Sequence, residues 1–217
     1  MSDPNTATLL RGSEQTTRSH WLRTAARWMV TFLGFPAGGL AAMLIVGPVD
    51  SPAKALAGGL VTGTIIGAVQ AWGLKLPVDR GRGPAVGWVA ATAVGLMVGL
   101  GIGATAVDFG TSLTSLVIQG AICGLMIGAA QAFVLRAPLG RLALLWPPAL
   151  AAIWAIGWMV TTLGGIQVED QFTVFGSFGA ITVTAITAVL PVIVSRRSVN
   201  PRSVNHRSVN QAEKSAS

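Results

Sequence analysis

The sequence predicts an all-α protein, a polytopic bundle of transmembrane helices. Of its 217 residues, 52% are hydrophobic and only 11% are charged, whereas soluble domains are about one quarter charged. Several apolar runs reach the roughly 20 residues that a helix needs to cross a hydrocarbon core about 30 Å thick. These runs are continuous rather than alternating, which favours helices over the strands of a membrane barrel.

Six spans are predicted, each free of charged residues except at its ends. They cover residues 28–47, 55–75, 86–107, 113–135, 144–164 and 173–194. The first is long for a signal peptide and lacks a convincing cleavage site, so we expect it to be a retained helix. The predicted transmembrane domain covers residues 21–195. It is flanked by a cytoplasmic tail at 1–20 and by a basic, disordered cytoplasmic tail at 196–217 that repeats RSVN three times.

The distribution of basic residues predicts the topology. Fourteen of the fifteen Lys and Arg residues lie in the two tails and in the second-to-third and fourth-to-fifth loops. The other loops hold Lys54 and four acids: Asp50, Asp108, Glu169 and Asp170. By the positive-inside rule, both termini are cytoplasmic and the acidic loops face outward. The net charge of +7 then reflects contact with anionic lipid headgroups rather than with nucleic acid.

An internal repeat is the most informative feature of the chain. The sequence carries Gly59, Gly63, Gly67 and Gln70 at intervals of four, four and three, and repeats this spacing at Gly120, Gly124, Gly128 and Gln131. These offsets place each set within an arc of about 80° on one helix face. A third set of small residues follows the same spacing: Gly176, Ala180, Thr184 and Thr187.

A tryptophan precedes each of these stripes at a similar distance. Trp28 lies 39 residues before Gly67, Trp88 lies 40 before Gly128, and Trp146 lies 38 before Thr184. The pattern predicts three parallel two-helix hairpins, at about 28–87, 88–145 and 146–195. Each hairpin would begin with a tryptophan that anchors it at the cytoplasmic interface.

The repeated glycines and glutamines have two interpretations. Glycines four residues apart let helices pack closely, and each glutamine would then hydrogen-bond a neighbouring helix, a contribution of about 0.6 kcal/mol. Alternatively, Gln70, Gln131 and Thr187 converge near the bundle axis as a polar ring that touches a substrate or ion. The acids of the outer loops likewise either ring an external mouth or simply complete helix ends in solvent.

The residues in the spans do not suggest catalysis or metal binding. No ionisable carboxylate, base or histidine lies inside a predicted span, whereas proton relays and ion-coupled carriers usually need one. Cys123 is the single cysteine, and His20 and His206 lie in the tails, so we expect no catalytic residue, no metal and no cofactor.

The motif GxxxGxxQAxxLR around Gly120, Gln131 and Arg136 resembles a loose group of uncharacterised bacterial polytopic membrane proteins. The first copy has Lys75 in place of the arginine, and the third lacks both the glutamine and the basic ending. The resemblance implies a bacterial inner-membrane protein and adds no activity. The expected function is a non-enzymatic scaffold or accessory subunit, with a small transporter or channel for a lipid or apolar molecule as the alternative. The expected partners are the bilayer, other membrane proteins and further copies of the chain.

Overall fold

The computed structural model describes residues 21–77, 83–165 and 176–198, and the described residues outside turns and loops are helical. The first helical run, Trp21–Ile45, contains a 3-10 turn at Thr31–Leu33 and continues as α2, Gly34–Ile45. Pro36 explains the tightened turn, because its ring lacks an N–H and crowds the carbonyl four residues earlier. The predicted N-terminal tail, with His20, and residues 199–217 of the predicted C-terminal tail, with His206 and most of the RSVN repeats, lie outside the described residues, as do Glu169 and Asp170. The first residues of that C-terminal tail, 196–198, are helical rather than disordered as predicted.

Four further long helices follow: α3 (Pro52–Gly73), α4 (Pro84–Ala106), α5 (Leu113–Leu139) and α6 (Trp146–Leu163). Proline occupies the first turn of α3, α4 and α6, where its missing N–H costs nothing because that group has no partner within the helix. A 3-10 segment, Gly140–Leu145, joins α5 to α6. Gly140 has a positive φ of 58°, a conformation that glycine adopts readily and that lets the chain reverse direction.

The described chain then ends with two short helices, α7 (Ser177–Thr187) and α8 (Val189–Ser198). Pro191 lies four residues after Thr187, so it removes a helical hydrogen bond to the Thr187 carbonyl and accounts for the break at Ala188. The continuous apolar stretch there, Ser177–Ile193, is shorter than a membrane span.

The number of spans differs from the prediction of six. Four helical runs of the described residues are long and apolar enough to cross a membrane: Trp21–Ile45, Pro52–Gly73, Pro84–Ala106 and Leu113–Leu163. The predicted fourth and fifth spans form one helical run because the 3-10 segment connects α5 to α6 without a gap. The predicted sixth span is shortened by its internal break at Ala188. The chain is therefore an all-helical protein with four membrane-length apolar runs.

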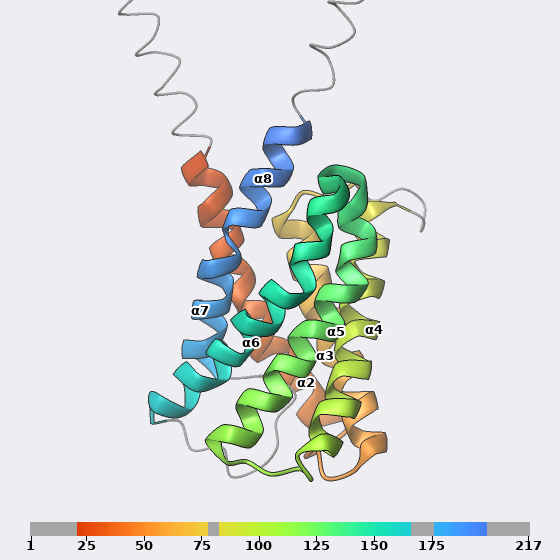
Figure 1. Cartoon of the computed structure of the whole chain (residues 1–217), viewed down its shortest axis with the longest axis vertical. Coiled ribbons are helices and arrows are strands. Elements are labelled where there is room, and N and C mark those ends of the chain that lie inside the picture. The colour runs from red at the N-terminus through yellow and green to blue at the C-terminus, as the bar shows by residue number, and fades with distance from the viewer. Residues whose placement is uncertain (1–20, 78–82, 166–175, 199–217) are drawn as a thin grey trace, which may run out of the picture.

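The helices pack in a closed order around an apolar centre (Figure 1). Each of the helices α2 to α7 contacts the next, and α7 returns to contact the first helical run. The centre contains buried side chains from all of these helices, including Phe35, Ile66, Leu100, Ile127 and Val183. Phe35 and Trp154 meet there with ring centroids 6.0 Å apart. The middle of the bundle is thus filled by side chains.

The predicted glycine stripes lie at helix contacts. A Cβ atom added at Gly59, Gly63 or Gly67 would lie 2.7–2.9 Å from backbone atoms of α4. One added at Gly120, Gly124 or Gly128 would meet the backbone of α6 at 3.0 Å or less. Since real Cβ contacts are almost never that short, a side chain at these positions would push the helices apart. Two glycines of a further stripe, Gly95 and Gly99, bring α4 equally close to α5, at 2.6 and 2.8 Å, whereas a Cβ atom added at Gly103 would lie 3.2 Å from Gln119.

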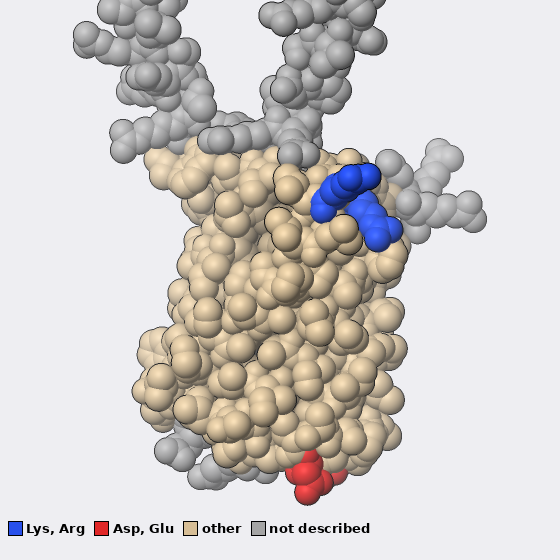
Figure 2. All heavy atoms as spheres, viewed as in Figure 1, with Lys and Arg blue, Asp and Glu red and all other residues tan. Residues whose placement is uncertain are grey.

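Charged residues separate to the two ends of the bundle. The visible face shows lysine and arginine at the end where the first helical run begins and α8 ends, and acidic residues at the opposite end (Figures 1 and 2). The turn between α5 and α6 lies at the basic end, and the turn between α4 and α5 lies at the acidic end. We call these the basic end and the acidic end.

Candidate functional site

The three repeated tryptophans are hydrogen-bond donors between helices near the basic end. The indole N–H of Trp88 donates to Oε1 of Gln70 at 3.2 Å, and that of Trp146 donates to Oε1 of Gln131 at 2.8 Å. The indole N–H of Trp28 donates to the hydroxyl of Thr187 at 3.2 Å and to the carbonyl of Thr184 at 3.1 Å. Each tryptophan therefore pairs with the polar residue at the end of one of the three predicted stripes.

Threonine hydroxyls extend these pairs into a network. Nε2 of Gln131 donates to the hydroxyl of Thr92 at 2.9 Å, and Thr92 in turn donates to the carbonyl of Trp88. The amide of Gln131 thus connects α6, α5 and α4, and the indole of Trp88 continues the connection to α3. On the other side, the first helical run reaches α3 through Arg27, whose Nε donates to the Gly73 carbonyl at 2.8 Å. We call the three tryptophan pairs, together with Thr92, the polar belt.

The members of the polar belt are not equally buried. Gln131 is 2% exposed and makes two side-chain bonds, whereas Gln70 is partly exposed and accepts one bond from Trp88. Trp28 and Trp88 are each 1% exposed, so both indoles lie inside the bundle, and their role as interface anchors stays a prediction. A buried indole N–H needs an acceptor, and the polar belt supplies one for each.

The structure does not bring Gln70, Gln131 and Thr187 to one shared partner. Each accepts from a different tryptophan, and none of the three lines either of two surface grooves between α3 and α4. This geometry favours the interpretation of the glutamines as interhelical bonds over that of a polar ring.

Sequence reasoning missed one buried amide, Gln119. This α5 side chain is fully buried, and both its amide oxygen and its nitrogen lack a hydrogen-bond partner among the described residues. It packs where α5 passes Gly103 of α4. A single amide within an apolar span could have indicated a buried polar residue at this position. Gln119 has no counterpart in the repeat, because the residue 61 positions earlier is Gly58.

The outer acids that the structure describes are solvent-exposed and lie in separate turns. Asp108 adopts a positive φ of 48° in the turn after α4, and the N-terminus of α5 is capped instead by Ser112, whose hydroxyl accepts from the N–H of Ser115. Asp50 lies before α3 and pairs with Lys54 at 2.6 Å. The carboxylate of Asp50 is thus paired with a lysine in the first turn of the helix that follows it.

The pair formed by Asp50 and Lys54 predicts a measurable titration. The hydrogen bond from Lys54 holds the pKa of the Asp50 carboxyl below its ordinary value of about 3.9. The Asp50 pKa is lower in the folded protein than in the unfolded chain. Any stabilisation from the pair is therefore fully present at a pH above the unfolded-state pKa, and it is lost as the pH falls through the folded-state pKa. We expect Lys54→Gln to raise the Asp50 pKa in a carboxyl NMR titration. An unchanged pKa would show that the pair does not persist in solution.

Comparisons with known protein families, with curated proteins and with solved structures give no match to this chain.

Proposed function

We propose that the chain is a non-enzymatic membrane scaffold or accessory subunit, built from three parallel hairpins that the polar belt fastens together. The observation that carries this proposal is the set of three tryptophan bonds. Trp88 of the second hairpin binds Gln70 of the first, Trp146 of the third binds Gln131 of the second, and Trp28 of the first binds Thr187 of the third. The order is cyclic, so each hairpin is joined to both of the others.

The glycine contacts support the same threefold assignment. Gly67, Gly63 and Gly59 approach the residues one, five and eight positions after Trp88, namely Val89, Ala93 and Leu96. Gly128, Gly124 and Gly120 approach the residues one, five and eight positions after Trp146, namely Pro147, Ala151 and Trp154. Two helix pairs therefore pack in the same register, as copies of one unit would. In this proposal α5 and α6 cross the membrane separately, and α7 and α8 together form the sixth crossing.

The packing of the bundle supports a scaffold over a carrier. The apolar centre is filled, and the polar residues near the basic end mostly bind one another, so their bonding capacity is largely used within the chain. Interhelical bonds of this kind fix which helices pair and in which register. A rigid bundle with a large apolar perimeter suits a partner that binds laterally within the membrane.

The proposed orientation places the basic end in the cytoplasm of a bacterial cell, with the protein in the inner membrane. Arg23, Lys75, Arg136 and Arg141 lie at or near that end of their helices, as the positive-inside rule requires of cytoplasmic segments. The resemblance to uncharacterised bacterial polytopic proteins is consistent with this location. A reporter fused after Ser217 that is active only in the cytoplasm tests the orientation.

The double variant Gln70→Leu with Gln131→Leu distinguishes the two functions. A scaffold predicts that the variant loosens the bundle and reduces copurification of whatever native membrane protein travels with the wild-type chain. If the variant instead keeps its stability and its partners but loses flux or ligand binding, the chain is a carrier. The matched control is Gln211→Leu, which replaces a glutamine in the predicted C-terminal tail.

A further inference from the structure

An apolar groove of about 720 Å³ lies on the flank of the bundle near the basic end. Its walls come from α3 and α4, and small side chains leave the hollow between them: Ala68, Ala71, Ala85, Ala90 and Ala93. From Thr64 to Trp72 the groove follows α3 for about 12 Å at about 1.5 Å per residue. Thr64, a polar residue of the wall, donates its hydroxyl to the Leu60 carbonyl of its own helix. The hollow therefore has the length and apolar lining that suit a hydrocarbon chain.

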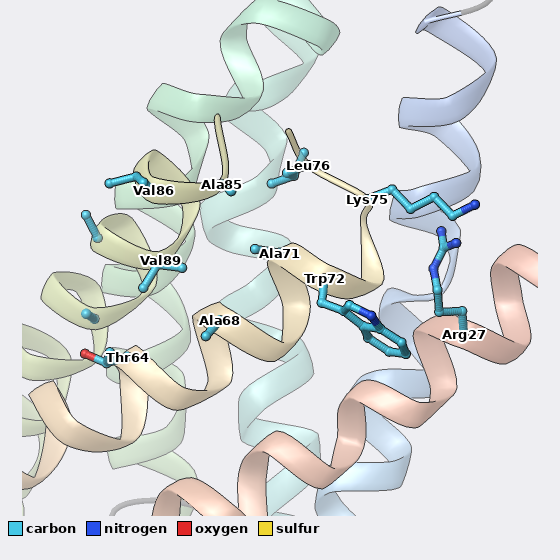
Figure 3. Close-up of a pocket in the computed structure, with 12 residues that line it drawn as sticks. Arg27, Thr64, Ala68, Ala71, Trp72, Lys75, Leu76, Ala85, Val86 and Val89 are labelled. Carbon is cyan, nitrogen blue, oxygen red and sulfur yellow. The ribbon is translucent and has the colours of Figure 1, made fainter. Parts of the chain in front are cut away.

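Two cations stand at the mouth of this groove. Figure 3 shows the side chains of Arg27 and Lys75 converging beside the Trp72 ring, at the end of the groove nearest the basic end. The Nε–H of Arg27 donates to the Gly73 carbonyl, which orients the guanidinium and leaves its two terminal amino groups for a ligand. Within the part of the chain that the structure describes, neither cation pairs with a carboxylate, because the salt bridge found there joins Lys54 to Asp50.

The backbone of Lys75 is held in an unfavourable conformation. Its φ is +54°, and its N–H and that of Leu76 bond back to the carbonyls of Trp72 and Ala71. This is the Schellman ending of a helix, whose left-handed position is usually glycine. A lysine there costs stability, and strain of this kind is often found at functional sites. The strained turn aims a cation at the groove mouth.

From this arrangement we infer that the groove binds an anionic phospholipid. The phosphate lies between the terminal amino groups of Arg27 and the ammonium of Lys75, with Trp72 beside the glycerol region, and one acyl chain lies along the alanine-lined hollow. Charge complementarity selects the occupant, because two cations that pair with no carboxylate of the described residues, at the edge of an apolar groove, match a phosphate attached to a hydrocarbon chain. The inference does not depend on the scaffold role.

The test compares two lipids that have the same acyl chains but different headgroups, one anionic and one zwitterionic. Delipidated full-length protein in detergent is titrated with phosphatidylglycerol and with phosphatidylcholine of the same acyl chains, and bound lipid is counted by native mass spectrometry. We expect one lipid site that prefers phosphatidylglycerol. Since a cation near a membrane surface contributes a factor of about five in affinity, Lys75→Gln should weaken phosphatidylglycerol binding about fivefold and leave phosphatidylcholine binding unchanged.

Three further variants separate the site from general effects. Arg136→Gln removes an equal charge from the same end of the bundle but from outside the groove, and it should leave phosphatidylglycerol affinity unchanged. Lys75→Gly should weaken binding as Lys75→Gln does while raising the melting temperature by about 2–4 °C through relief of strain. Ala68→Leu fills the groove at an exposed wall position and should reduce binding of both lipids.

Several outcomes would overturn the inference. Equal affinity for the two lipids, or equal losses in Arg136→Gln and Lys75→Gln, would show that the protein attracts anionic lipid only through its overall charge. Displacement of the lipid by millimolar soluble glycerol phosphate would mean that the site recognises the phosphate group without the chain. If Ala68→Leu changes the oligomeric state while bound lipid stays constant, a second copy of the chain occupies the groove instead.

Discussion

Replacing Gly124 by alanine is expected to destabilise the bundle by about 1–3 kcal/mol, a typical cost of overpacking. The added Cβ would lie 2.9 Å from the Cα of Ala151 and closer still to the Leu150 carbonyl. Both neighbours are backbone atoms of α6, which cannot move without shifting the whole helix. Reversible unfolding in mixed micelles, followed by tryptophan fluorescence, measures the change in the free energy of unfolding.

Gly87→Ala is the matched control for this prediction. Gly87 also lies inside a helix, but its nearest neighbour would be a methyl group of Val134 at 3.7 Å, an ordinary contact distance. Because alanine is favoured over glycine in helices by up to about 1 kcal/mol, this variant should be neutral or stabilising. Equal effects of Gly87→Ala and Gly124→Ala would mean that α5 and α6 do not pack as closely as described.

The second large effect is expected at Gln131. The Gln131→Leu variant removes an acceptor from Trp146 and a donor to Thr92, and measured interhelical bonds in membranes contribute about 0.6 kcal/mol on average and about 1.7 at most. The expected loss is therefore about 1–2 kcal/mol for Gln131→Leu and about 0.6 for Gln70→Leu. Thr187→Val should cost less than either, because the Trp28 indole keeps the Thr184 carbonyl as an acceptor.

A double-mutant cycle separates the bond from the packing. If the Trp146 indole and the Gln131 amide interact directly, Trp146→Phe and Gln131→Leu together should cost less than the sum of the single variants. The pair Trp21→Phe with Gln131→Leu is the control, since Trp21 is 46% exposed and lies on a different helix from Trp146. Additive losses at Trp146 and Gln131 would contradict the bond.

Much of the bundle can be predicted from the sequence because the membrane imposes a strong length constraint. Continuous apolar runs predicted the four membrane-length helical runs, with ends within a few residues for α3 and α4. The count of six was not reproduced, for reasons that are local to the chain. Gly140 allows a tight helical turn where a loop was expected, and Pro191 breaks the final helix.

The polar belt was only half predictable. The spacing placed Gln70 and Gln131 on the glycine faces and put the tryptophans at the same end of the bundle. It therefore predicted that the glutamines and the tryptophans lie near the same end of their helices. Spacing along one helix does not determine which neighbouring helix faces it, so the pairing of each glutamine with the tryptophan of the following helix could not be predicted. Lys75 was likewise identified only as a basic residue of the second-to-third loop that replaces the motif's arginine, because its positive φ depends on how the helix ends.

Hydrogen exchange of the indole N–H groups tests the central claim that three hairpins are joined by three tryptophan bonds. In protein labelled with ¹⁵N-tryptophan, the indoles of Trp28, Trp88 and Trp146 should exchange far more slowly than that of the exposed Trp72. Gln70→Leu should accelerate the exchange of Trp88 alone, and Gln131→Leu that of Trp146 alone. The account would be contradicted if all three indoles exchanged at the rate of Trp72. It would also be contradicted if Gln70→Leu and Gln131→Leu accelerated the exchange of the same indoles.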